Sequence, residues 1–120
     1  MHEISLEYWS KYTLLEQLGN IGSEVGRSIK AYKNNDQKAF DAALYRAVDL
    51  FEVTAKCWVK AYPNRVKEIL RAKEEFLRLF FDDNFKDAEN IERYFMYFAY
   101  AARYEKVGWC KSDVWCNNYR

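Results

Sequence analysis

The stretch LEQLGNIGSEVGRSIKAY, residues 15–32, decides the fold of this chain. Residues on one side of it recur at intervals of three and four: Leu15, Leu18, Gly22, Val25, Ile29 and Tyr32. This spacing aligns a narrow stripe along a helix, as in helical bundles and coiled coils. Gly19, Gly22 and Gly26 lie along or beside the stripe, where each costs roughly 0.8–1 kcal/mol relative to alanine. We therefore expect close helix packing at these three glycines, because a tightly packed neighbour recovers the loss.

Turn signals divide the chain on either side of these glycines into helices. The first helix is expected from about Leu6 to Lys33, where a polar cluster ends it. Asn34 followed by Gln37 resembles the capping signature of a second helix. Pro63 ends that helix, because the residue before a proline is pushed away from helical geometry. A third helix is expected directly after this proline.

The last two helices complete the predicted fold. The third helix is expected to stop at Asp82-Asp83-Asn84, and Asp87 is a candidate cap for the fourth. The helical pattern breaks down after Gly108. Since short connections make consecutive helices antiparallel neighbours, the sequence predicts an all-α, single-domain antiparallel four-helix bundle over residues 1–108. Residues 109–120 are expected to form a short aromatic C-terminal tail.

Composition narrows the class of protein further. The chain has 120 residues, half of them hydrophobic, which is enough for one core without disulfides or metal. Nineteen Lys and Arg against 18 Asp and Glu leave a net charge of +1, so no global field attracts nucleic acid or an acidic membrane. The N-terminus shows no secretory signal, and no apolar run is long enough to span a bilayer. We expect a soluble cytoplasmic protein with no membrane partner.

The three cysteines are widely spaced and include no C-x-x-C pair. Buried or incidental thiols in a reducing compartment are one interpretation of Cys57, Cys110 and Cys116. A Cys110–Cys116 bridge in the tail is the alternative.

Residues that all-α enzymes use for catalysis are scarce. The only histidine is His2, so di-iron Glu-x-x-His sites, an Arg-x(4–6)-His ribonuclease motif and Ser–His or Cys–His nucleophiles all lack their imidazole. No G-x-x-x-x-G-K-[ST] motif is present to cradle phosphate. We expect a non-enzymatic protein with no catalytic residue, no metal site and no cofactor.

One enzymatic alternative rests on carboxylates in the first two helices: Glu16, Glu24, Asp49 and Glu52. The segments around them faintly resemble the all-α nucleoside triphosphate pyrophosphohydrolases, which use an acidic E-x-x-E pair and a later E-x-x-D pair. Here Asn20 or Ser23 stands in place of one paired glutamate, and Arg46 stands in place of another. At about 100° per residue these carboxylates point away from the apolar faces, which favours a solvated surface over a shared metal site.

A second resemblance lies within residues 17–28. The pairs Gln17-Leu18 and Asn20-Ile21, then Glu24 and Gly26-Arg27-Ser28, resemble a motif of a family of small bacterial four-helix-bundle proteins, with altered spacing. That family includes proteins encoded in 23S rRNA intervening sequences and accessory proteins of diversity-generating retroelements. The resemblance implies a cyclic oligomer that binds nucleic acid or a reverse transcriptase. The chain is also similar to functionally unassigned bacterial proteins with an E-Q-L-x-N-I-G-S-E-V-G-R segment.

Polar and aromatic side chains indicate a binding function. The candidate partner surface is formed by the side of the first helix opposite the stripe and by two tail tryptophans: Glu16, Asn20, Glu24, Arg27, Trp109 and Trp115. The tail either folds back onto the helices or meets a partner. Four Trp, ten Tyr and eight Phe exceed what one narrow core of this size readily absorbs, so we expect a homo-oligomer. The leading hypothesis is a self-associating interaction or scaffold module with an unknown protein partner.

Nucleic-acid binding is the main alternative. Basic residues of the third helix and the C-terminal half form a candidate nucleic-acid face: Arg65, Arg71, Arg78, Arg93 and Arg103. Glutamates are interleaved with them, so an ordinary charged surface with ion pairs one helical turn apart is the competing interpretation.

Overall fold

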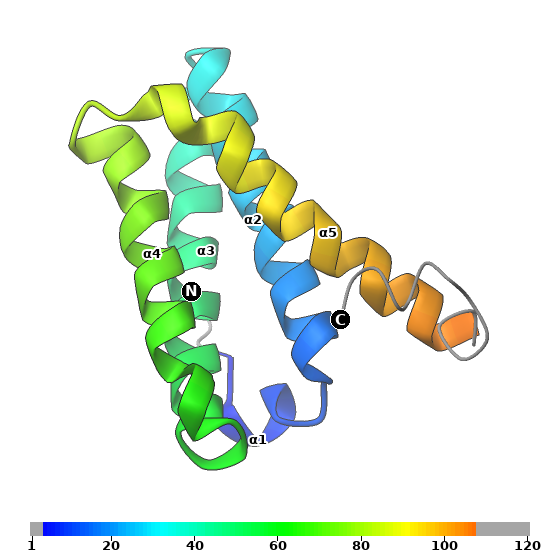
Figure 1. Ribbon diagram of the computed structural model, residues 1–120. Coiled ribbons are helices and arrows are strands. Elements are labelled where there is room, and N and C mark those ends of the chain that lie inside the picture. The colour runs from blue at the N-terminus through cyan, green and yellow to red at the C-terminus, as the bar shows by residue number, and fades with distance from the viewer. Residues whose placement is uncertain (1–3, 108–120) are drawn as a thin grey trace.

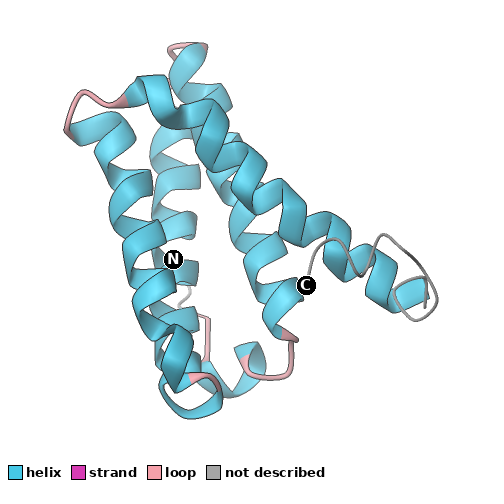
Figure 2. Cartoon of the chain, in the orientation of Figure 1, coloured by secondary structure: helices cyan, strands magenta, loops and turns pink. Residues whose placement is uncertain are grey.

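The computed structural model describes residues 4–107, and within this range every element is helical, which confirms the all-α part of the prediction. A short helix α1 (Leu6–Trp9) precedes four long ones: α2 (Leu14–Lys33), α3 (Gln37–Ala61), α4 (Val66–Phe81) and α5 (Ala88–Val107). Two 3₁₀ turns, η1 (Pro63–Arg65) and η2 (Phe85–Asp87), lead into α4 and α5. Short loops make the remaining connections (Figure 2).

The prediction of one continuous helix from Leu6 to Lys33 is wrong, because the helix is interrupted between Trp9 and Leu14. The break follows from a capping box at the start of α2. The Thr13 hydroxyl accepts from the Glu16 backbone N–H at 3.1 Å, and the Glu16 carboxylate accepts from the Thr13 N–H at 2.9 Å. These two bonds satisfy donors that a helix start leaves free, so they stabilise a new helix here.

The capping signature expected at Asn34 is also wrong. Asn34 is the C-cap of α2, and Asn35 adopts the left-handed conformation with φ of 55°. Asp36 is the N-cap of α3, where its carboxylate accepts from the Ala39 N–H at 3.2 Å. The predicted end of this helix before Pro63 is confirmed, since α3 ends at Ala61.

The long helices pack unequally. Helix α2 packs extensively against both α3 and α5, and α3 packs against α4. Helix α5 instead crosses α2 obliquely and moves away from α4 along its length (Figure 1). An aromatic cluster joins α2, α4 and η2, with the Tyr32 ring centroid 5.0 Å from that of Phe80 and 4.7 Å from that of Phe85. Below this cluster, α4 and α5 make few contacts.

Glycines set the contact between α2 and α5. A Cβ on Gly22 would lie 2.7 Å from the Phe95 Cβ, and a Cβ on Gly19 would lie 3.2 Å from the Ala99 Cα. The separation at Gly22 is too short for any side chain, and the one at Gly19 is tighter than most Cβ contacts, so these glycines permit the close approach of α5. A Cβ on Gly26 would meet only the Glu92 carboxylate, at 3.8 Å, which is an ordinary contact.

The core contains a buried polar network as well as apolar side chains. The Trp58 indole N–H donates to Gln17 Oε1 at 2.8 Å, and Gln17 Nε2 donates to the Trp9 carbonyl at 3.0 Å. The Trp9 indole N–H donates to Thr54 Oγ1 at 2.8 Å. Gln17 and Thr54 are 2% and 0% exposed, so the network lies inside the core and ties α1, α2 and α3 together. No sequence pattern singled out this network.

Candidate functional site

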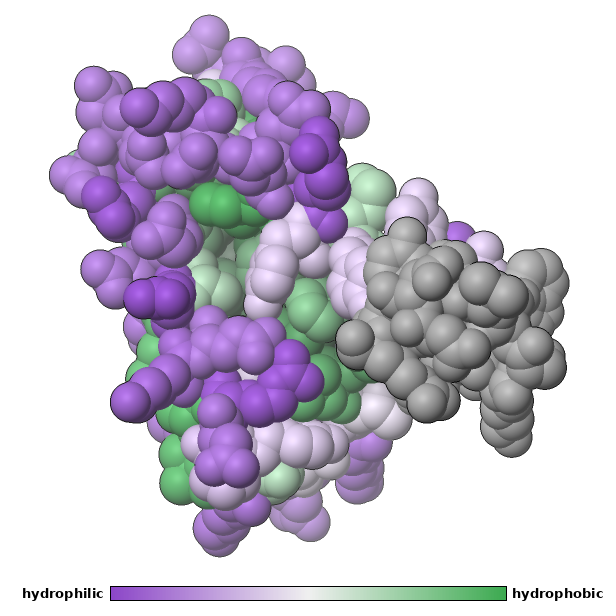
Figure 3. Space-filling model, in the orientation of Figure 1, coloured by the Kyte–Doolittle hydropathy of each residue, from purple (hydrophilic) through white to green (hydrophobic). Residues whose placement is uncertain are grey.

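The divergence of α4 and α5 leaves a groove of about 710 Å³ between them, which we call the α4–α5 groove. Figure 3 shows a hollow with apolar side chains at its floor and hydrophilic side chains around it. Ten residues line it: Lys67, Glu68, Arg71, Ala72 and Glu75 from α4, and Asp87, Asn90, Ile91, Tyr94 and Phe95 from η2 and α5. Its volume lies in the range typical of ligand and peptide sites between helices.

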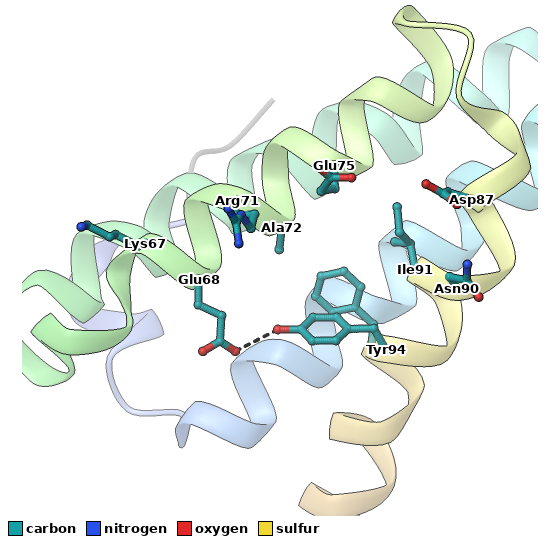
Figure 4. Close-up of a pocket in the computed structure, with 10 residues that line it drawn as sticks. Lys67, Glu68, Arg71, Ala72, Glu75, Asp87, Asn90, Ile91 and Tyr94 are labelled. Atoms are coloured by element: carbon teal, nitrogen blue, oxygen red, sulfur yellow. Dashed lines mark hydrogen bonds between the residues drawn. The ribbon is translucent and has the colours of Figure 1, made fainter.

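Arg65, Glu68 and Tyr94 form a hydrogen-bonded chain across one end of the groove. The Tyr94 hydroxyl donates to Glu68 Oε1 at 2.8 Å and so joins α5 to α4 (Figure 4). Arg65 donates to both carboxylate oxygens of Glu68, at 3.0 and 2.9 Å. The Arg65 guanidinium also lies 5.6 Å from the centre of the Trp58 ring, which fixes its position.

Burial and hydrogen bonds shift the pKa values of Glu68 and Tyr94 in opposite directions. Burial would raise the pKa of Glu68, but the hydrogen bonds from Arg65 and Tyr94 outweigh it and hold the pKa below its ordinary value. Burial and the hydrogen bond to Glu68 raise the pKa of Tyr94 well above its ordinary value. At neutral pH Glu68 is therefore a fixed negative charge and Tyr94 a fixed donor, and neither exchanges a proton readily.

The charges at the rim of the groove are separated along its length. Lys67 and Arg71 are exposed at the end near Glu68, and within residues 4–107 neither makes an ion pair or hydrogen bond. Glu75 and Asp87 lie toward the other end (Figure 4). Between the two charged ends lie Ala72, Ile91 and Phe95, so the groove combines an apolar floor with a bipolar rim.

A second apolar surface lies on the opposite side of α4. Leu70 and Phe81 are 49% and 68% exposed, and Leu77 lies between them. We call these three residues the outer face of α4. Lys73, Glu74 and Arg78 flank it. Large apolar side chains this exposed on one helix face are typical of an interface.

The structure separates the residues of the predicted partner surface. Glu24 is only 13% exposed and pairs with Arg27 at 3.0 Å and with Arg46 of α3 at 3.1 Å, so it joins α2 to α3 rather than projecting freely. Glu16 belongs to the capping box. Asn20 and Arg27 are exposed, as expected. Glu16 and Glu24 are both partly buried, so within α2 the predicted partner surface is fully exposed only at Asn20 and Arg27.

Most arginines of the candidate nucleic-acid face are neutralised within the chain. Arg65 pairs with Glu68, Arg78 with Glu75 and Asp82, and Arg93 with Glu89. Arg71 and Arg103 are the two exposed members that make no such pair in the described part of the chain. Paired guanidinium groups offer little charge to phosphate, so this arrangement weakens the case for nucleic acid.

Other candidate sites have these outcomes. Trp109, Trp115, Cys110 and Cys116 lie outside the described residues. Burial raises the pKa of the Cys57 thiol, which is 8% exposed. Within residues 4–107, no group of three or more His, Cys, Asp or Glu side chains is placed to hold a metal ion.

The carboxylates of the pyrophosphohydrolase resemblance are engaged elsewhere. Glu52 pairs with Lys73 at 3.4 Å and Glu24 with two arginines. No helix within residues 4–107 has the length and apolar character needed to cross a membrane.

The sequence did not predict the α4–α5 groove, because the helical periodicity of its residues does not distinguish them from an ordinary solvent-exposed face. The cations and carboxylates of α4 have the spacing of an ordinary solvated face, and only the course of α5 turns that face into one wall of a hollow. Comparisons with known proteins give no match to a family model, a curated protein or a solved structure.

Proposed function

We propose that this chain is a non-enzymatic, cytoplasmic interaction module that binds a partner protein in the α4–α5 groove. The observation that carries the proposal is the groove itself: about 710 Å³ of space over an apolar floor, beside exposed cations that lack a partner in residues 4–107. Grooves between helices with this composition are a common means of protein recognition. On this proposal the four long helices form an antiparallel bundle that is open on one side.

A site-specific photocrosslinker tests the proposal. We would place p-benzoylphenylalanine at Asn90, an exposed residue of the groove, and irradiate cells that express the full chain. The matched control carries the same group at Lys56, an exposed residue of α3 outside the groove. A discrete adduct at residue 90 and not at residue 56 is expected. The absence of any specific protein adduct at residue 90 would contradict the proposal.

The mass of the adduct identifies the class of partner. A second protein supports binding of a different partner, and twice the chain mass supports binding of a second copy. An adduct that nuclease digestion removes would favour the nucleic-acid alternative and contradict our proposal.

Self-association is the second part of the proposal, and the outer face of α4 supports it. Leu70 and Phe81 are about half and two-thirds exposed, which is costly for large apolar groups unless another surface covers them. Light scattering after size-exclusion chromatography should give a discrete oligomer for the wild type and a smaller species for Leu70→Glu with Phe81→Glu. A monomeric wild type would contradict self-association. A cyclic assembly would accord with the resemblance to the small bacterial four-helix-bundle family.

A further inference from the structure

Resting on the proposed function, we infer that the occupant of the α4–α5 groove is an amphipathic helix of a partner protein. Its apolar residues would lie on the groove floor. An acidic side chain would face Lys67 and Arg71, and a basic side chain would face Glu75 and Asp87. The inference defines the chemistry of the partner segment, which the proposed function leaves open.

The shape of the groove favours a helix over an extended peptide or a single small molecule. Its walls are two helices, α4 and α5, so no strand edge within residues 4–107 borders it to pair with an extended chain. The floor of Ala72, Ile91 and Phe95 takes apolar side chains spaced at three and four residues, which is the pattern that one face of a helix presents.

The distribution of charge defines what flanks those apolar residues. Lys67 and Glu75 are eight positions apart on α4, which corresponds to roughly 12 Å at 1.5 Å per residue. Glu75 pairs with Arg78 at 3.6 Å and Asp87 accepts from the Asn84 amide at 3.0 Å, so the carboxylates at the other end are partly compensated, whereas within residues 4–107 Lys67 and Arg71 are not. A simple anion such as a fatty acid would satisfy Lys67 and Arg71 but would leave these two carboxylates beside an apolar chain. A helix with an acidic residue at one end and a basic residue about two turns away suits both ends of the rim.

The hydrogen bonds to Glu68 leave Lys67 and Arg71 as the groups at this end of the groove that can bind an incoming carboxylate. Glu68 already accepts from Arg65 and Tyr94, so its charge is compensated within the protein. Lys67 and Arg71 make no such bond in the described residues, so they remain available to an incoming carboxylate. Charge pairs of this kind contribute to the specificity and rate of association.

A peptide selection on the full chain tests the inference. A phage-displayed library of randomised helical peptides would be selected on the wild-type protein. Phage that still bind Asn90→Trp would be removed, because this substitution fills the groove from an exposed position. We expect the recovered peptides to carry apolar residues at three- and four-residue spacing, an acidic residue at one end and a basic residue about two turns away. Circular dichroism would check that each protein variant is folded and that the peptide becomes helical on binding.

A charge swap provides the decisive measurement. Arg71→Glu should raise the Kd of the selected peptide by about tenfold or more. Replacing the peptide's acidic residue with arginine should restore binding to that variant. The control Lys56→Glu makes the same charge change on α3 and should alter the Kd by less than about twofold.

The outcomes separate the inference from the proposed function. Peptides that bind the groove without an acidic residue, or that tolerate Arg71→Glu, would overturn the inference and leave the groove as a protein site. Bound peptides that stay extended would have the same consequence. Failure to recover any peptide sensitive to Asn90→Trp, together with no adduct at residue 90, would overturn both.

Discussion

The two sides of α5 behave oppositely. Toward α2, the Gly22 position leaves no room for a Cβ and the Gly19 position leaves only a tight one, so the two backbones lie close together. Toward α4, the same helix leaves a hollow of about 710 Å³ that a hydrogen bond from Tyr94 to Glu68 spans. The comparison teaches that glycines on one helix can open a groove on the far side of its neighbour, because α5 is drawn toward α2 and so moves away from α4.

The largest expected effect on stability comes from adding a side chain at the close contact between α2 and α5. Gly22→Leu should lower the free energy of unfolding by about 3 kcal/mol, because its Cβ alone would lie 2.7 Å from that of Phe95. Urea denaturation monitored by circular dichroism measures the change. As a control, Gly26→Ala meets only ordinary contact and should stabilise by roughly 0.5–1 kcal/mol. Equal midpoints for wild type and Gly22→Leu would contradict the close-packing model.

The next largest effect tests the contact of α2 with α1 and α3, which the buried hydrogen bonds of Gln17 hold together. Gln17→Leu should destabilise by about 2 kcal/mol, because it leaves the Trp58 indole N–H and the Trp9 carbonyl without their buried partners. Urea denaturation again provides the measurement. The exposed substitution Gln37→Leu is a matched control and should change the stability by less than about 0.5 kcal/mol. If the two variants were equally stable, the buried network would contribute nothing.

A smaller effect tests the link across the groove through its pH dependence. The folded state lowers the pKa of Glu68, so its carboxylate adds stability above the unfolded pKa of about 4.3, and this is lost as the pH falls through the lower folded value. The difference between wild type and Glu68→Gln should be below about 1 kcal/mol at neutral pH, since the site is partly exposed, and should vanish in acid. Urea titrations at neutral and acidic pH measure it.

The control for this pH dependence is Glu89→Gln, which removes the carboxylate of the highly exposed Arg93 pair on α5. Because this pair is exposed, Glu89→Gln should change the free energy of unfolding by less than about 0.5 kcal/mol at neutral pH. If the stability difference between wild type and Glu68→Gln grew as the pH fell, the folded state would not lower the pKa of Glu68, and the prediction would be contradicted.

The smallest expected effect on stability comes from adding an apolar side chain in the α4–α5 groove. Asn90→Leu adds an apolar side chain to the groove and should change the free energy of unfolding by less than about 0.5 kcal/mol. The same residue type is thus introduced on both sides of α5, at positions 22 and 90. Thermal unfolding of the two variants in parallel gives the comparison directly. Comparable losses of stability would mean that the groove is already closed in solution.

Much of the secondary structure could be predicted because its causes are local. Pro63 ends α3 through a clash with the preceding residue, and the apolar periodicity of 15–32 depends only on helical geometry. The break before α2 was equally local, since Thr13 and Glu16 form a readable capping box, but the long apolar stripe obscured it. The start of α3 was misplaced by two residues because Asn34 and Asp36 are both plausible caps.

The candidate site could not be predicted in the same way. Gly19 and Gly22 indicated a close neighbour, but nothing in their spacing named α5 as that neighbour. Likewise, Glu24 and Arg71 are both charged residues in helices, yet Glu24 is held between two arginines and Arg71 makes no ion pair within residues 4–107.

The sequence by itself determined that this protein is helical, where most of its helices end and which residues are small enough for close packing, because these depend on contacts within a few residues. Only the tertiary structure decided that α5 packs on α2 and leaves α4, and therefore that Lys67 and Arg71 border a groove. The reason is physical: helix periodicity specifies which face is apolar, whereas the crossing of two helices depends on side chains that are distant in the chain.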